Sequence, residues 1–135
     1  MSSIFKVFLA ALLLISCTTT ITKTKSPKFT ETNDSLAVTL DKLIRCQHVN
    51  VNGEEVTTNG KTRSVLEIDI VNGKQAPEDT AAIKALGKSI GSAVKKALAD
   101  KNEYDVFKVL FVKQEEKAGV TTRSWQGSEY ESADL

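Results

Sequence analysis

The sequence has few of the residues on which metal and thiol chemistry depend, with one histidine and two cysteines among 135 residues. Structural zinc sites need about four cysteine or histidine ligands, so we expect no metal site and no cofactor. The chain also lacks a Gly-x-Ser-x-Gly motif, a phosphate-binding loop and a dinucleotide-binding motif. We therefore expect a non-enzymatic protein with no catalytic residues.

An excess of basic charge is also missing. Residues 1–16 contain Lys6 alone among the 18 basic residues and none of the 17 acidic ones, so the remainder is nearly neutral. Nucleic-acid-binding proteins depend on basic residues that neutralise phosphates, so we do not expect a nucleic-acid partner. The composition, 41% hydrophobic and 26% charged, is typical of one folded globular domain.

No apolar run is long enough to cross a bilayer. The run 7–15 is continuously apolar, but it is about half of the roughly 20 residues that a spanning helix needs. A lysine before a short apolar core, with small residues after it, is typical of a secretory signal peptide. We therefore expect residues 1–16 to be a signal peptide.

The end of this run is more specific. Leu14-Ile15-Ser16-Cys17 resembles the lipobox of bacterial lipoproteins. The resemblance implies that the Cys17 thiol receives a diacylglycerol, that the chain is cut before it, and that the new amino end is often acylated. Two or three acyl chains make a durable anchor, since each buried methylene contributes about 0.8 kcal/mol. An ordinary secreted signal with an incidental cysteine, or a short buried helix, remains the alternative.

The same resemblance bears on location. In many lipoproteins an aspartate directly after the cysteine retains the protein at the inner membrane, and this chain has Thr18 there. We therefore expect attachment to the periplasmic face of the outer membrane. Residues 17–34 are rich in threonine, serine and lysine, which predicts a lipidated cysteine followed by a flexible tether of roughly 20 to 25 Å.

Residues 35–135 are expected to form the folded domain. Apolar residues at even positions predict a half-buried strand over 35–51. A helix behind an Asp34 cap is the competing interpretation, and its apolar positions are Leu36, Leu40, Leu43 and Ile44. Asn52-Gly53 and Asn59-Gly60 then predict a long polar connection to a strand over 61–71, where apolar and polar residues alternate.

The second half of the domain begins with a predicted helix. Pro77, Glu78 and Asp79 suit the start of a helix, and the segment 80–99 carries apolar residues on one face. Residues 103–116 are apolar on both parities, which favours a central strand, and a weaker strand with Trp125 and Tyr130 follows. The sequence thus predicts an α+β, two-layer domain: an antiparallel sheet of about four strands in the order ββαββ, with one long helix on one face.

Three candidate sites remain. Cys46 and His48 pair a free thiol with the only histidine, but on a strand their Cα atoms would lie about 6.6 Å apart, which is too far for a ready dyad. Glu67 and Asp69 share a strand face that we expect to be wet. Trp125 either packs beneath the helix, which we favour, or forms an exposed binding hot spot.

These observations favour a lipid-anchored cell-envelope protein that acts as a non-enzymatic binding or accessory module. Its expected partners are the membrane, through Cys17, and another envelope protein. The contact would use an exposed strand edge or the second face of the sheet. The alternative is a small envelope thiol enzyme or hydrolase that uses Cys46 and His48.

Overall fold

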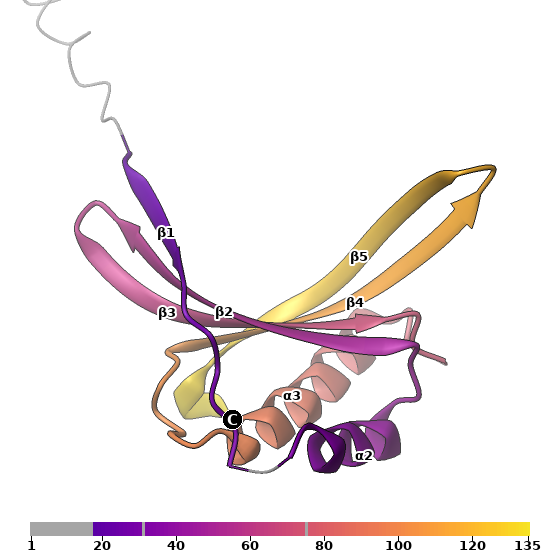
Figure 1. Ribbon diagram of the computed structural model, residues 1–135, viewed down its shortest axis with the longest axis horizontal. Coiled ribbons are helices and arrows are strands. Elements are labelled where there is room, and N and C mark those ends of the chain that lie inside the picture. The colour runs from indigo at the N-terminus through magenta and orange to yellow at the C-terminus, as the bar shows by residue number, and fades with distance from the viewer. Residues whose placement is uncertain (1–17, 31, 75) are drawn as a thin grey trace, which may run out of the picture.

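The computed structural model describes residues 18–30, 32–74 and 76–135, with the side chains of Asn33 and Asp34 left out. Within these ranges the chain forms a sheet with two helices against one of its faces (Figure 1). The elements are β1 (Thr20–Thr24), α2 (Asn33–Leu43), β2 (His48–Thr58), β3 (Lys61–Val71), α3 (Thr80–Ala97), β4 (Val106–Lys117), β5 (Val120–Glu131) and the 3-10 turn η1 (Ser132–Asp134).

The sheet has five strands in the order β1-β2-β3-β4-β5. β3 and β4 are parallel, and every other neighbouring pair is antiparallel. The predicted four-stranded antiparallel sheet with one helix, in the order ββαββ, is therefore wrong. The physical reason is that α3 returns the chain to the beginning of β3 before β4 starts, which makes a β-α-β crossover rather than a hairpin.

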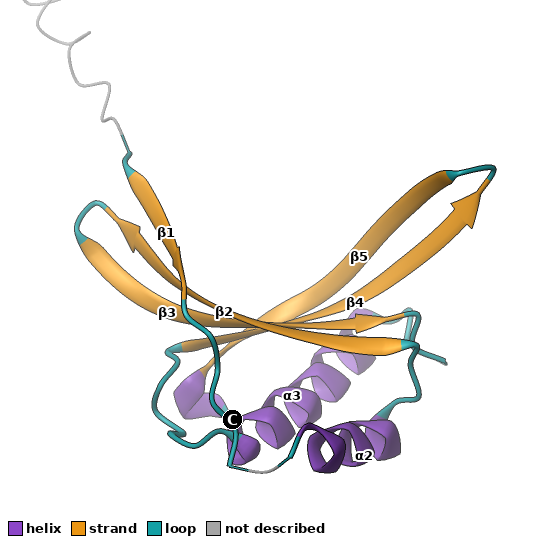
Figure 2. Cartoon of the chain, in the orientation of Figure 1, coloured by secondary structure: helices purple, strands orange, loops and turns teal. Residues whose placement is uncertain are grey.

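Two hairpins extend beyond the helical layer, as Figure 2 shows. We name them the β2–β3 arm and the β4–β5 arm. Each arm turns through two residues with positive φ, Asn59 (51°) with Gly60 (79°) and Ala118 (50°) with Gly119 (77°). Such two-residue turns match the right-handed twist of the strands. The first arm closes at Asn59-Gly60, so the connection is tight rather than long, and Gly53 lies inside β2.

Residues 33–43 form helix α2, so the strand predicted over 35–51 is wrong for its first half. Leu36, Leu40 and Ile44 are buried, and they recur every four residues, whereas Val38 is 57% exposed. Positions four apart satisfy both a period of two and a helical period, so the even-numbered pattern alone did not separate the two interpretations. The competing helix is the one that forms, although its N-cap is Thr32.

The segment expected to be a tether is held against the domain where the structure describes it. Thr20–Thr24 pair with β2 as strand β1. Beyond β1, the Lys25 N–H donates to the Gly53 carbonyl at 2.7 Å, and the Thr30 N–H donates to the Ala97 carbonyl at 2.9 Å. Threonine-rich segments suit strands as well as linkers, because β-branched side chains favour extended backbone.

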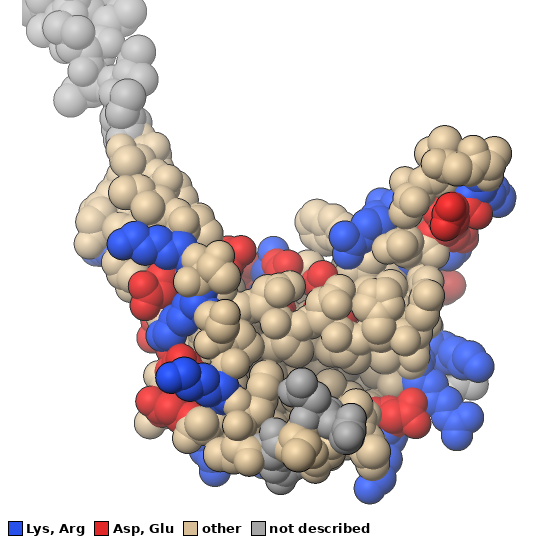
Figure 3. Space-filling model, in the orientation of Figure 1, with Lys and Arg blue, Asp and Glu red and all other residues tan. Residues whose placement is uncertain are grey.

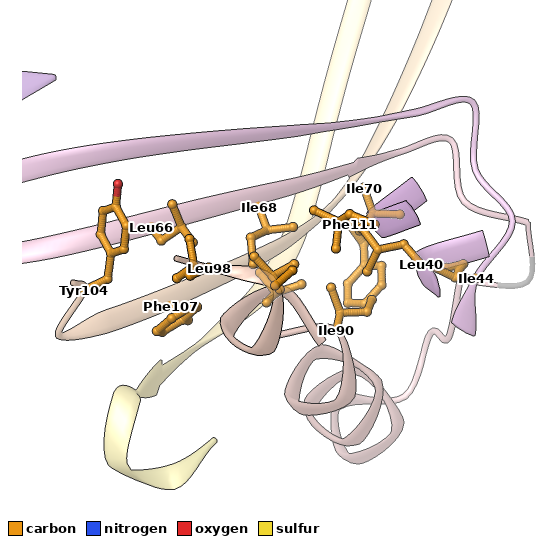
Figure 4. Close-up of a cluster of buried hydrophobic side chains, with 14 of the residues drawn as sticks. Leu40, Ile44, Leu66, Ile68, Ile70, Ile90, Leu98, Tyr104, Phe107 and Phe111 are labelled. Carbon is orange, nitrogen blue, oxygen red and sulfur yellow. The ribbon is translucent and has the colours of Figure 1, made fainter. Parts of the chain in front are cut away.

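The core lies between the sheet and the two helices, and Figure 4 shows its side chains. Helix α3 confirms the predicted helix, with Asp79 as its N-cap accepting a hydrogen bond from the Ala82 N–H at 3.0 Å. Its predicted apolar face is buried. The glycines on that face permit close approach of β5 and the C-terminus, because a Cβ on Gly87 would collide with the Tyr130 hydroxyl and one on Gly91 would lie 3.1 Å from Leu135.

Candidate functional site

The face of the sheet opposite the helices lies between the two arms, and we name it the helix-free face. Figure 3 shows a hollow between the arms with charged side chains along it. The strand register places three rows of residues across its middle. From β2 to β5 these rows are His48-Val71-Val112-Trp125, Asn50-Asp69-Leu110-Gly127 and Asn52-Glu67-Lys108-Glu129.

A small apolar cluster lies within this face, separate from the main core. It contains Val71, Leu110 and Val112, all of which are at most 8% exposed. This cluster explains why β4 is apolar at both odd and even positions. Its odd-numbered apolar residues face the helices, and Leu110 and Val112 belong to the cluster on the other face. The helix-free face therefore combines a buried apolar centre with a polar periphery.

Asp69 is the least ordinary side chain on this face. It is 8% exposed, and its Oδ1 is buried with no hydrogen-bond partner among the described residues. Arg123 of β5 brings Nη2 to 3.7 Å from Asp69 Oδ2, so its side chain crosses β4 to reach β3. Burial raises the pKa of the Asp69 carboxyl and nearby Glu67 adds to this, while Arg123 and Lys108 oppose it.

Further charge pairs lie along the same face, one next to Asp69 and one nearer the start of β3. Lys108 Nζ lies 2.9 Å from Glu67 Oε2, and Arg63 Nη2 donates to both carboxylate oxygens of Glu131 at 2.7 Å. These pairs are partly or largely exposed, so solvent screens them and they contribute little to stability. Their arrangement matters more for recognition, because it fixes where a partner must place its own charges.

Trp125 is 68% exposed on β5. The prediction that it packs beneath the helix is wrong, because its register with Val112 places it on the helix-free face. The neighbouring parity of β5 faces α3 instead, where Tyr130 Oη donates to the Lys84 carbonyl at 2.7 Å. Exposed tryptophans are enriched among residues that dominate protein interfaces.

The proposed thiol and imidazole pair is not assembled. Cys46 packs against the main core on the helical side, whereas His48 shares the helix-free face with Val71. Burial raises the pKa of the Cys46 thiol, and the Asp41 carboxylate raises it further. A raised pKa reduces the thiolate fraction, which is the opposite of what a catalytic nucleophile needs.

The other predicted features are placed as follows. Cys17 lies outside the described residues. Glu67 and Asp69 share a face as expected, but Asp69 is buried rather than wet. Across residues 18–30, 32–74 and 76–135 there is no group of three or more histidine, cysteine or acidic side chains that could hold a metal ion. Among those same residues, no helix is both long and apolar enough to cross a bilayer.

Comparison of the chain with protein-family models, curated proteins and solved structures found no match. The geometry of the chain offers two candidate binding surfaces, the helix-free face and the open edge of β5.

Proposed function

We propose that this chain is a lipid-anchored, non-enzymatic binding module of the cell envelope, attached through Cys17 to the periplasmic face of the outer membrane. The anchoring is supported by the resemblance of residues 14–17 to a lipobox. The binding role is supported by one structural observation: exposed Trp125 lies beside a charged network built around the buried Asp69 carboxylate.

The chemistry of this face suits a protein partner. An aromatic side chain supplies contact area at low entropic cost, and the alternating charges supply orientation. An exposed aromatic side chain with polar groups around it is typical of a transient interface. The alternative of a thiol enzyme using Cys46 and His48 is not favoured, because the raised pKa of the Cys46 thiol reduces its thiolate fraction.

The anchoring is tested by mass spectrometry of the mature protein from membranes. We expect an amino terminus at Cys17 that carries diacylglycerol, and we expect Cys17→Ser to abolish both the cut and the lipid. An unmodified chain that begins at Met1, recovered from the soluble fraction, would contradict the proposal.

The binding role is tested by photocrosslinking in intact cells. A crosslinking amino acid at position 125 is compared with one at Lys88, an exposed residue of α3 on the opposite layer. We expect discrete adducts from position 125 and none from position 88. Absence of adducts from position 125 and from Asn50, another exposed residue of the helix-free face, would count against this surface.

A further inference from the structure

The free edge of β5 is unusually open. β5 is the last strand of the sheet, and its Val120–Glu131 pair with β4 in one continuous register. It has no proline, lysine or bulge, and its charged residues are Arg123, Glu129 and Glu131. The opposite edge differs, because β1 has only five residues and includes Lys23. Of the two edge strands among the described residues, β5 is therefore the longer and the one whose charges include both signs.

The sequence of β5 is complementary to itself. On its helix-free side the strand presents Arg123, Trp125, Gly127 and Glu129 in turn. If a second β5 runs antiparallel about Gln126, Arg123 lies opposite Glu129, and Trp125 lies opposite Gly127. Twofold symmetry repeats each pair, so the interface contains two Arg-Glu pairs and two Trp-Gly pairs. Opposite charges and an aromatic across from glycine are both favourable cross-strand neighbours.

We propose that the β5 edge binds a second copy of this chain, in the antiparallel register centred on Gln126. The two sheets then join into one, with both helical layers on the same side. Each indole lies opposite Gly127 of the other copy, against the Leu110 side chain, which fills the place of the missing Cβ. This inference deepens the proposed function, because it takes the β5 edge as a binding surface and names its partner.

Neighbouring registers fit less well. A shift in one direction puts Trp125 opposite Glu129 and Arg123 opposite Glu131, which Arg63 already holds through two hydrogen bonds of 2.7 Å. A shift in the other direction puts Trp125 opposite its own copy and leaves Arg123 without an acidic partner. In the register centred on Gln126, Arg123 exchanges its approach to Asp69, which is only 3.7 Å, for the Glu129 carboxylate of the other copy, and the indole lies opposite a glycine.

A charge exchange tests the pairing in the full chain, purified in detergent micelles and examined by analytical ultracentrifugation. Arg123→Glu places two glutamates opposite each other, and Glu129→Arg places two arginines opposite each other. Each single variant should weaken dimerisation by about tenfold or more, because like charges directly opposite are destabilising. The double variant restores both pairs in the reverse sense, so it should dimerise within about threefold of the wild type.

A disulfide test reads the register directly in a Cys46→Ser background. Residue 126 faces its own copy across the twofold axis, so Gln126→Cys should form a dimer disulfide under mild oxidation. Ser124→Cys is the matched control, because it faces Ser128 of the other copy and should not crosslink to itself. The parent Cys46→Ser chain, run beside both variants, shows any contribution from Cys17.

Three outcomes would overturn the inference. They are a monomeric wild type, a double variant that remains as weak as the single ones, and Ser124→Cys crosslinking as efficiently as Gln126→Cys. Retained circular dichroism shows that a weakened variant is still folded. A monomer that still yields adducts from position 125 would refute self-pairing and leave the proposed function standing. A dimer whose Cys17 carries no lipid would refute the anchoring and leave the self-pairing standing.

Discussion

Tyr104 donates a hydrogen bond from Oη to the Lys25 carbonyl oxygen at 2.9 Å, although 79 positions separate the two residues. Gly53 of β2 lies at the same place, where a Cβ would collide with both the Tyr104 ring and that carbonyl oxygen. The ring is 1% exposed, and its edge-to-face partner is Phe107, with centroids 6.5 Å apart. This contact fixes the N-terminal segment onto the core.

Replacing Tyr104 by phenylalanine should lower the free energy of unfolding by about 1 to 3 kcal/mol. The ring still fills its site, but the Lys25 carbonyl loses a hydrogen-bond donor in a partly buried setting. Urea unfolding followed by circular dichroism measures the loss.

Gly53→Ala should also destabilise the protein, by about 1 to 3 kcal/mol, because the added methyl forces the backbone of the N-terminal segment away.

Gly60→Ala is the matched control for the glycine. Gly60 has φ of 79° with nothing within 4 Å of an added Cβ, so only the left-handed backbone penalty of about 1 to 2 kcal/mol applies. Hydrogen exchange separates the two variants, since only Gly53→Ala should speed the exchange of the Lys25 amide. Equal exchange of that amide in both variants would contradict the contact.

The buried Asp69 carboxyl should make the protein less stable as pH rises. Its folded pKa is raised above the ordinary 3.8, mainly by burial, so the folded state holds this proton more tightly than the unfolded state. This contribution is present in full below the unfolded pKa and is lost as pH rises through the folded one. Asp69→Asn should therefore stabilise the protein more at pH 7 than at pH 4, as urea unfolding at both values can show.

Arg123→Gln provides the companion measurement. Arg123 favours the ionised form of Asp69, so its removal should raise the pKa of that carboxyl further. Carbon-detected NMR titration of the Asp69 side chain, at concentrations too low for association, measures the shift. A titration unchanged by Arg123→Gln would show that the 3.7 Å approach of the two side chains has no electrostatic effect in solution.

Trp125 is the chain's one tryptophan, so intrinsic fluorescence reports on it alone. In dilute protein we expect the long-wavelength emission of an exposed indole, readily quenched by iodide. At concentrations where the chain dimerises, emission should move to shorter wavelengths, and Arg123→Glu should prevent the change. Short-wavelength emission from dilute Arg123→Glu would show instead that the indole is buried within one copy.

Cys46 should react slowly with alkylating agents. Burial and the Asp41 carboxylate both raise the pKa of its thiol above the ordinary 9.0, and the thiolate is the reactive form. Iodoacetamide labelling at pH 8 should be slower in the folded chain than in urea. Asp41→Asn should increase the folded rate, and labelling as fast as in urea would contradict a shielded thiol.

The elements that the sequence predicted well have apolar residues that repeat with a single period, and residues that mark where the element begins and ends. Helix α3 has a single apolar face and the Asp79 cap, and β3 alternates cleanly, so each pattern admits one interpretation. α2 was misassigned because its buried residues at 36, 40 and 44 satisfy two periods. β1 was missed because its only apolar residue, Ile21, is 52% exposed, so no buried side chain marks the strand.

The site was harder to predict than the helices because it depends on neighbours. Alternation in β3 predicted a wet Asp69, yet the second apolar parity of β4, at Leu110 and Val112, buries that face. The sequence did contain a sign of this burial, because residues 106–112 are apolar at both odd and even positions. The exposure of Trp125 depends on the register with Val112, which pairing rather than local sequence decides.

The Asn59 N–H donates to the Thr19 carbonyl at 3.2 Å, so the start of the described chain lies beside the turn of the β2–β3 arm. Cys17 is two residues further, about 7 Å of extended chain. With a lipid on Cys17, as we propose, the tip of this hairpin, including Lys61, would rest among the head groups. Acyl chains and hairpin would then set the tilt of the domain on the bilayer, a geometry that a free tether would leave undefined.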